Sequence, residues 1–268
     1  MASRGRRARQ QEKTNWLIGS FLLLMTAAVV VAVSFYLMKA PDAVDELTLC
    51  PADGAREHYV LLVDATNPLN FVQRQAFAII TRDLVENRVP EGALLSVFAL
   101  GEDFSATAKP LVELCNPGSG TGKSELTSNV RRLKQRYEAQ FIAPLMEKTE
   151  ALANAVPAKH SPILEMLQMV GLNGFRRHSI AGKRRLIIMS DMLHNTPSFS
   201  MYKAEFSYGP FSQTDYGRRV VADLDGVEVE LHYLMNSPQL QTKRQLLFWE
   251  EYFSASGARI VLVRPLEG

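Results

Sequence analysis

The stretch Tyr59-Val-Leu-Leu-Val-Asp64 decides the fold of this chain, together with a second stretch of the same kind, Leu186-Ile-Ile-Met-Ser190-Asp191. Each is a short, continuous apolar run that ends in an acidic residue, and such runs are typical of strands buried in a parallel sheet. Ligands of an open parallel sheet bind in the crevice just beyond the carboxyl ends of its strands. We therefore expect Asp64 and Asp191, with Thr66 close behind the first, to converge on one ion or one partner.

Strand and helix patterns alternate along the remainder of the chain. We expect a long helix that bends or breaks at Pro144, because proline removes a backbone donor, and a later helix that Ser161 caps and Gly174 ends. The alternation predicts an α/β fold with a doubly wound, mostly parallel sheet and one short antiparallel strand at an edge. The further expected strands are residues 93–100, 110–115, 227–235 and 258–263, and the expected helices are residues 71–88, 124–155, 161–172 and 239–254.

A membrane anchor precedes these elements. Residues 16–38 carry no charge, and as a helix they would be about 35 Å long, enough to cross a hydrocarbon core of about 30 Å. Basic residues gather before this stretch, so the positive-inside rule places the amino terminus in the cytoplasm and the following domain outside, in a bacterial periplasm. Because the small-residue motif at residues 32–34 lies inside the apolar run, we expect the anchor to remain uncleaved in the cell membrane.

The charge pattern supports four segments: a basic arm (1–15), a membrane helix in the lipid bilayer (16–38), a connector (39–57) and one folded domain (58–268). The formal net charge of the chain is +2, but it becomes negative without the arm, which holds five basic residues and Glu12. A short basic arm beside a membrane helix normally contacts anionic lipid. We therefore expect no nucleic-acid binding.

The chain has two cysteines, Cys50 and Cys115, and both fall on the expected outer side of the membrane. In an oxidising compartment they could pair and tie the connector to the domain, which the chain-entropy model values at roughly 3 to 5 kcal/mol. The alternative is two unrelated buried thiols.

The order of these motifs resembles the von Willebrand factor A domain over about residues 55–266. Members of that family that bind metal hold Mg²⁺ or Mn²⁺ through an Asp-x-Ser-x-Ser motif, a distant Thr and a further Asp, and leave one position open for a partner's carboxylate. The resemblance implies that Asp64 and Thr66 fill the first two places, that Ser161 replaces the Thr and that Asp191 supplies the last.

The third place of the motif falls on Pro68, which has no side-chain oxygen. Magnesium requires near-octahedral oxygen ligands, so the implied metal site is degenerate and its affinity should be low. Asn67 or Asn70 could offer an amide oxygen, or water could fill the gap. The alternative is that Asp64 and Asp191 cap neighbouring backbone amides and hold no metal.

Residues 117–124, Pro-Gly-Ser-Gly-Thr-Gly-Lys-Ser, end like a phosphate-binding loop. The first glycine of that motif is replaced by Pro117, the helix expected to follow is highly charged, and an exported domain would meet little ATP. A flexible turn is therefore the favoured interpretation, and a nucleotide site is the weaker one.

Aromatic residues concentrate in the long loop expected at residues 195–215. Aromatic side chains provide large contact areas at low entropic cost and are common interface anchors. We expect this loop to contact a protein partner, and the alternative is a lid that folds over the core of its own domain. The expected partner-binding residues are Asn67, His194, Phe199, Tyr202, Phe206 and Tyr208.

These observations favour a membrane-anchored, extracytoplasmic protein-binding or assembly module with a weak site for Mg²⁺ or Mn²⁺. The five histidines show no zinc-like spacing, and no serine lies in a Gly-x-Ser-x-Gly elbow, so no reaction is expected. The alternatives are a metal-dependent hydrolase that uses the Asp64 and Asp191 crevice or, less favoured, a nucleotide-binding protein that uses residues 117–124.

Overall fold

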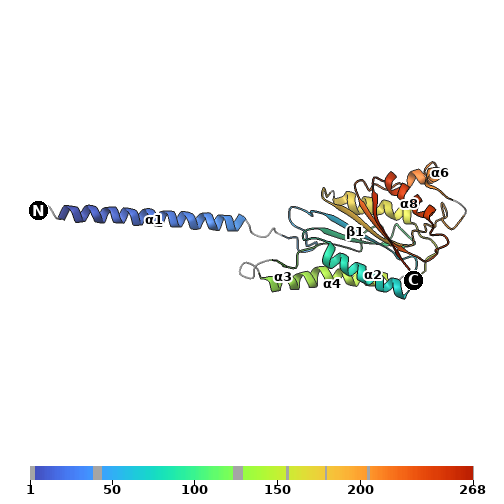
Figure 1. Cartoon of the computed structure of the whole chain (residues 1–268), viewed down its shortest axis with the longest axis horizontal. Helices are drawn as coiled ribbons and strands as arrows, with labels where there is room; N and C mark the ends of the chain where they lie inside the picture. Colours follow the sequence, from blue (N-terminus) through green and yellow to red (C-terminus); the bar gives the residue numbers. More distant parts are fainter. Residues whose placement is uncertain are drawn as a thin grey trace. The chain divides into compact units, whose positions relative to one another are not determined.

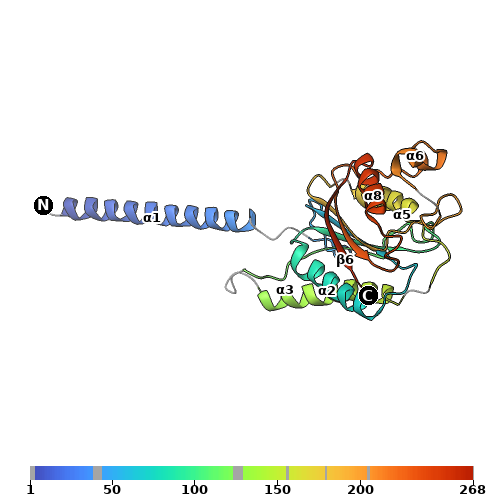
Figure 2. The ribbon, with the colours of Figure 1, turned by 45° about the vertical axis from the view of Figure 1, so that its right-hand side comes forward.

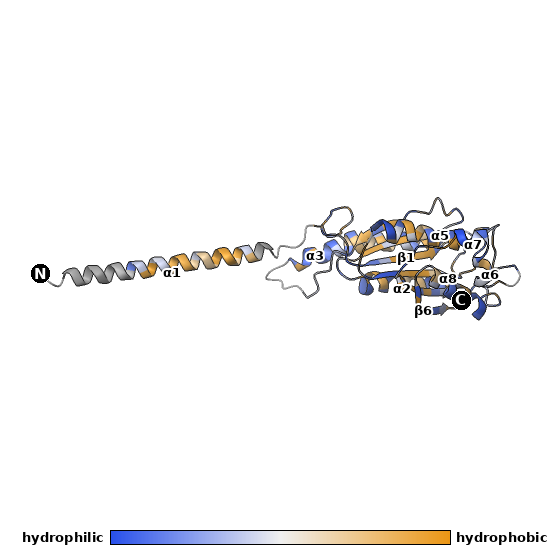
Figure 3. Ribbon diagram, turned by 90° about the horizontal axis from the view of Figure 1, so that it is seen from above, coloured by the Kyte–Doolittle hydropathy of each residue, from blue (hydrophilic) through white to orange (hydrophobic). Residues whose placement is uncertain are grey.

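The computed structural model describes residues 4–38, 44–122, 129–154, 157–178, 180–203 and 206–267. The chain divides into two compact units, Met1–Ala43 and Val44–Gly268. The first unit contains one helix, α1 (Arg4–Met38), drawn in blue in Figure 1. Its segment Asn15–Phe35 has a mean hydropathy of 2.4 and is long and apolar enough to cross a membrane. Figure 3 shows apolar residues along this segment.

The second unit is built on one six-stranded sheet with the strand order β3-β2-β1-β4-β5-β6. All neighbouring strands are parallel except β2 and β3, which are antiparallel. This confirms the predicted mostly parallel sheet with a short antiparallel strand at one edge. The strands are β1 (His58–Asp64), β2 (Leu94–Leu100), β3 (Val112–Cys115), β4 (Arg184–Ser190), β5 (Glu228–Leu234) and β6 (Arg259–Leu266).

Helices cover both faces of the sheet, as Figures 1 and 2 show. One face packs against α2 and α4, and the other against α5 and α8. The helices of this unit are α2 (Phe71–Asp83), α3 (Val130–Arg136), α4 (Ala143–Leu152), α5 (Ile163–Met169), α6 (Tyr208–Ser212), α7 (Asp215–Arg219) and α8 (Lys243–Ala255), with π-helical segments at Leu84–Arg88, Tyr137–Ile142 and Val170–Arg176.

The central strand β1 is buried along its whole length, because helices cover the sheet on both sides. Its alternate side chains divide between two cores: Val60 and Leu62 face the α5 and α8 side, whereas Leu61 and Val63 face the α2 and α4 side. Each such aliphatic side chain contributes roughly 1.5 to 3 kcal/mol by leaving water. The continuous apolar run in the sequence therefore corresponds to a strand that is covered twice.

The predicted start and end of the α5 helix are wrong. The cap position is Pro162 and not Ser161, and the helix continues through Gly174 to Arg176. A Cβ atom on Gly171 would lie 2.7 Å from the Asp223 carbonyl oxygen, whereas one on Gly174 would make only ordinary contact with the Phe98 ring at 3.5 Å. Gly171 therefore serves close packing, and Gly174 does not end the helix.

The helix predicted over 124–155 is partly confirmed. Helical structure runs from α3 through a π-helical segment to α4, and residues 123–128 lie outside the described part. The wide turn stands immediately before Pro144, where Ala143 N–H donates to the Glu138 carbonyl five residues back. A proline ring obstructs the ordinary helical hydrogen bond, and the wider turn accommodates it. The end of the phosphate-loop-like motif, Lys123 and Ser124, lies outside the described residues.

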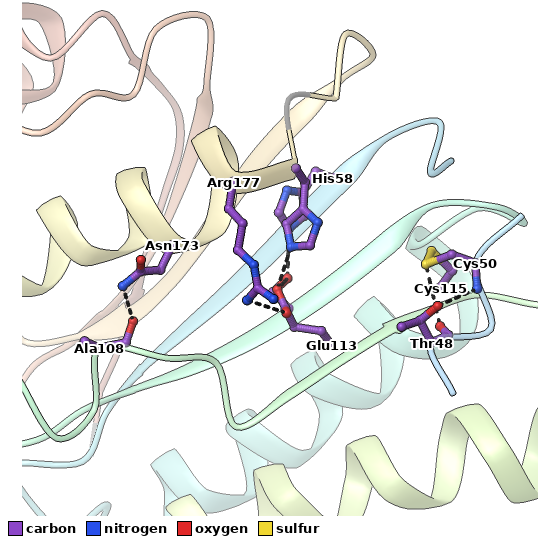
Figure 4. A network of polar contacts seen from close by, with 10 residues as sticks. Thr48, Cys50, His58, Ala108, Glu113, Cys115, Asn173 and Arg177 are labelled. Atoms are coloured by element: carbon purple, nitrogen blue, oxygen red, sulfur yellow. Dashed lines mark hydrogen bonds and ion pairs between the residues drawn. A yellow bond between two sulfur atoms is a disulfide. The ribbon is translucent and has the colours of Figure 1, made fainter. Parts of the chain in front are cut away.

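The predicted disulfide between Cys50 and Cys115 is confirmed, with 65 residues of sequence separation (Figure 4). The segment before it is folded as well, because Cys115 N–H donates to the Thr48 carbonyl (2.8 Å) and Thr48 N–H donates to Asp45 (2.7 Å). Residues 44–57, which were expected to form part of a connector, thus belong to the same compact unit as the sheet.

A buried polar network links the strands near this disulfide (Figure 4). His58 Nε2 lies 2.8 Å from Ser96 Oγ, which donates to Glu113 at 3.0 Å, and His178 Nε2 lies 2.9 Å from the same carboxylate. Burial, together with the neighbouring His178, lowers the pKa of His58 to about 3, against the charge of Glu113. The His58 ring is therefore neutral at pH 7, and the network secures the edge strand β3 to β2 and β1.

Candidate functional site

The strand order places the candidate site. The strand order reverses between β1, whose other neighbour is β2, and β4, so the carboxyl ends of β1 and β4 form the switch point at which open parallel sheets bind ligands. Asp64 ends β1, and Asp191 follows β4 directly. Both side chains are buried, with exposed fractions of 3% and 2%. We call these two residues the acid pair.

Hydroxyl groups hold the carboxylate of Asp64. Thr66 donates to Oδ1 through both its hydroxyl (2.6 Å) and its backbone N–H (3.0 Å), and Ser190 Oγ donates to Oδ2 (2.5 Å). Ser190 Oγ itself accepts a hydrogen bond from Met192 N–H (2.9 Å). Burial raises the pKa of Asp64, and these hydrogen bonds act in the opposite direction. The contact with Ser190 joins the ends of β1 and β4, as the sequence predicted.

Asp191 has fewer donors. Its Oδ1 accepts from Leu193 N–H (2.9 Å), and its Oδ2 lies 3.4 Å from the Asn67 amide nitrogen. Burial, together with the negative charge of Asp64, raises the pKa of Asp191 to about 7, against hydrogen bonds from Leu193 and Asn236. No lysine or arginine in the described part of the chain offsets this negative charge. The acid pair is therefore an electrostatically costly arrangement.

Helix α8 holds the turn that carries Asp191. Met192 adopts a positive φ of 54°, which is uncommon for a residue other than glycine. Its carbonyl accepts hydrogen bonds from Gln245 Nε2 (2.6 Å) and Trp249 Nε1 (2.9 Å), and Gln241 donates to the Asp191 carbonyl (3.1 Å). Sequence analysis missed these residues, because neither the strained turn nor its distant supports have a local signal.

Ser161 lies on the segment that borders the same crevice. Ala158 N–H donates to the Thr66 carbonyl (2.9 Å), and the Ser161 backbone pairs with Asn195 in both directions at 2.9 Å. The Ser161 side chain is buried, and its hydroxyl has no partner among the described residues. This oxygen is one of eleven buried side-chain atoms without a partner among the described residues, and a cation beside it would supply one.

The candidate metal ligands supply two carboxylates and two hydroxyls, which are the hard oxygen donors that Mg²⁺ and Mn²⁺ accept. They are Asp64, Thr66, Ser161 and Asp191. The described residues contain no group of three acidic, histidine or cysteine side chains suited to a metal. Any ion at this site would therefore need the hydroxyl groups as ligands, because Pro68 contributes no side-chain oxygen. The donor set fits a divalent cation, with fewer charged ligands than a strong site has.

The loop after β4 folds over the core of its own domain. Phe199 lies 4.6 Å from the Phe211 ring and 5.8 Å from the Phe248 ring, between ring centroids. Phe206 and Tyr208 also pack against Phe248. The short helices α6 and α7 lie in and just after the stretch expected to be irregular. These contacts fit the lid that sequence analysis left open as an alternative.

Two other expected partner-binding residues differ in exposure. His194 is fully buried, with its ring nitrogens near Leu164 N–H (3.4 Å) and the Tyr216 hydroxyl (3.1 Å). Tyr202 is 47% exposed. Burial raises the pKa of Tyr202 to about 12, and the charges of Asp191 and Asp64 contribute to the rise. Tyr202 thus lies close enough to the acid pair for its charges to raise the tyrosine pKa, while its side chain remains exposed to solvent.

A small cavity of about 290 Å³ adjoins Tyr202. Hydroxyl groups, two aromatic rings and one cation line it, and Ala204 and Glu205 lie outside the described residues. The lining residues are Thr196, Pro197, Ser198, Phe199, Ser200, Lys203 and Phe206. This mixture of apolar and polar lining residues suits a side chain of another protein.

Comparisons with known proteins add little to this description. No protein-family model matches the chain. No curated protein matches it either. Among solved structures, it is similar to an aerotolerance-related membrane protein from Bacteroides fragilis NCTC 9343, a variant with multiple mutations to serine. The likeness covers 78% of this chain and 90% of that chain at 10% identity, with a TM-score of 0.35. A likeness this weak carries no argument about function.

Proposed function

We propose that this chain is a membrane-anchored protein-binding module whose folded domain lies outside the cytoplasm and whose crevice beside β1 and β4 holds Mg²⁺ or Mn²⁺. One observation carries the proposal: the acid pair is buried, each carboxyl group has a raised pKa, and no basic side chain of the described residues offsets the charge. Buried like charges are retained at a cost, and a bound cation would remove that cost.

The metal would occupy the space between the acid pair and the hydroxyls of Thr66 and Ser161. The orphaned Ser161 hydroxyl supports this placement, because a cation would give it a partner. Pro68 leaves the ligand set incomplete, so a carboxylate of a bound protein could complete it, as the resemblance to the von Willebrand factor A domain implies. The expected consequence is weak metal binding that strengthens when the partner is present.

The partner surface would consist of Tyr202 and the adjoining cavity with Lys203. Tyr202 is exposed and close to the acid pair, so one bound protein could contact the aromatic ring and reach the metal together. Phe199 and Phe206 also line this cavity. An exposed tyrosine beside a pocket is a typical interface anchor.

Metal binding tests the first half of the proposal. We would titrate the full chain in neutral detergent micelles with Mn²⁺ and follow the free ion by its paramagnetic resonance signal. Wild type should bind one ion, and Asp191→Asn should abolish binding. Asp45→Asn is the matched control, because Asp45 is a carboxylate in a turn of the connector segment. The proposed metal site is contradicted if the wild-type protein does not bind Mn²⁺, or if Asp45→Asn abolishes Mn²⁺ binding as Asp191→Asn does.

Photo-crosslinking tests the second half. A photoreactive amino acid at position 202 should form a discrete adduct with one protein in intact cells, and a metal chelator should reduce that adduct. The control position is Val72 on α2, which is 53% exposed. Equal labelling from both positions would contradict the proposed surface. A reporter fused after Gly268 tests the topology, since an exported terminus is expected.

A further inference from the structure

A second cavity lies at the opposite end of the sheet from the acid pair. Its volume is about 450 Å³, and three loops line it where β4, β5 and β6 begin. The lining residues are Ala181, Gly182, Lys183, Arg184, Gly226, Val227, Glu228, Gly257, Ala258 and Arg259. We call this cavity the basic cleft. A seven-residue strand is roughly 20 Å long, so the basic cleft is separate from the metal and partner surface.

The charge of the basic cleft is positive. Three cations line it, Lys183, Arg184 and Arg259, against one carboxylate, Glu228. Glu228 is already neutralised, because Arg259 lies 2.7 Å and Arg185 3.3 Å from its oxygens, with Lys183 at 3.9 Å. These cations lower the pKa of Glu228, the Arg259 hydrogen bond most of all. Further negative charge is therefore not repelled by a free carboxylate of the lining.

Arg184 is the cation that the fold leaves available. It makes no hydrogen bond or ion pair within the described part of the chain, although Arg185 next to it contacts both Glu228 and Glu230. Its guanidinium lies over Gly226, where a Cβ atom would approach Nη2 to 2.9 Å. Arg184 is partly buried, and none of its nitrogens is among the buried atoms without a partner, so its guanidinium donors remain open to a ligand.

Glycines keep the floor of the basic cleft free of side chains. Gly226 and Gly257 have positive φ values of 66° and 79°, and a Cβ on Gly257 would lie 2.8 Å from the backbone of Asp225. The Asp225 carboxylate lies beside Gly257 but does not line the cleft, and its negative charge weakens the positive potential on that side. Because no side chain projects from these glycines, a ligand in the cleft could reach Lys183 and Arg184.

From this combination of an open cavity, a surplus of cations and an unused guanidinium, we infer that the basic cleft binds a phosphate group. Arginine and lysine are the side chains that hold phosphate oxygens, arginine through two parallel hydrogen bonds. The volume exceeds what a small ion requires, so the phosphate would carry an organic group. The chain has a candidate membrane span, so a phospholipid headgroup is one source of such a phosphate, and a soluble phosphate is the other.

The test uses the full chain under two conditions that separate these sources. In maltoside micelles, which contain no phosphate, inorganic phosphate is titrated and followed by phosphorus magnetic resonance. In nanodiscs, hydrogen exchange of residues 181–185, 226–228 and 257–259 is compared between phosphatidylcholine alone and a mixture with phosphatidylglycerol. Saturable binding in micelles, slower exchange with phosphatidylglycerol, or both would support the inference, and the pattern identifies the source.

Three variants make the test specific. Arg184→Gln and Lys183→Gln should each weaken phosphate or headgroup binding at least tenfold, and Lys183 is exposed enough that its variant should fold even if the other does not. Arg132→Gln on α3 removes the same charge from an exposed site elsewhere and should change nothing. The inference is overturned if neither condition gives an effect, or if Arg132→Gln weakens binding as much as the cleft variants. A chelator should not alter the result, which distinguishes this site from the metal site.

Discussion

Replacing Asp191 by asparagine should make the domain more stable, although it removes a candidate metal ligand. Asn is nearly isosteric with Asp, remains uncharged and can still accept the hydrogen bond from Leu193 N–H. The variant therefore removes the like charge beside Asp64 without leaving a hole in the buried crevice. A residue retained at a cost in stability is the pattern expected for a functional site.

The magnitude follows from the pKa. Folding shifts the pKa of Asp191 from 3.8 to about 7, which is roughly three units at about 1.4 kcal/mol each. Above pH 7, ionised Asp191 thus costs the folded state at most about 4 kcal/mol. Because the amide accepts hydrogen bonds less strongly than the carboxylate, we expect a net gain of about 2 kcal/mol at pH 8. A raised pKa favours folding at low pH and loses that contribution as the pH rises through 7, so the gain should vanish near pH 4.

Urea unfolding of the full chain in micelles with a chelator measures this gain. Trp249 is fully buried and reports on the domain, while a Trp16→Phe background removes the signal from α1. Asp45→Asn is the control, and it should show no gain, because hydrogen bonds from Thr48 lower the pKa of Asp45. The reasoning is refuted if Asp191→Asn is less stable than wild type at pH 8, or if its gain does not depend on pH.

The same unfolding assay checks three further expectations. Serine at both Cys50 and Cys115 should lower the free energy of unfolding by about 4 kcal/mol for a 65-residue separation, and a loss under about 1 kcal/mol would contradict the chain-entropy account. His58→Gln should reduce the loss of stability between pH 7 and pH 5 by about 2 kcal/mol, because His58, with its pKa lowered from 6.5 to about 3, takes up a proton only on unfolding; an unchanged slope would exclude that cause. Phe199→Ala should cost about 2 kcal/mol or more if the loop is a lid on the core, whereas a loss near zero would indicate a loop free to bind.

The sequence by itself determined the class of the fold and the meeting of two strand ends. The apolar runs before Asp64 and Asp191 have the length and composition of doubly covered strands, and the helices between them have apolar positions at helical spacing. Such patterns are local, and parallel strands joined by helices have few arrangements open to them. The sequence also predicted the candidate membrane helix at residues 16–38, from its length and lack of charge. The disulfide could be predicted because both cysteines follow that helix on the same expected side of the membrane.

Only the tertiary structure decided how the crevice is built and what surrounds it. The positive φ of Met192 depends on Gln245 and Trp249, which lie more than fifty residues later in the chain. Gly174 resembles a helix terminator but lies inside a helical segment that continues to Arg176. The aromatic loop has the composition of an interface, but its rings pack against Phe248 on α8. Burying these rings against the core is more favourable than leaving them in water. Each outcome rests on contacts between residues far apart in sequence, whose energies no local pattern records.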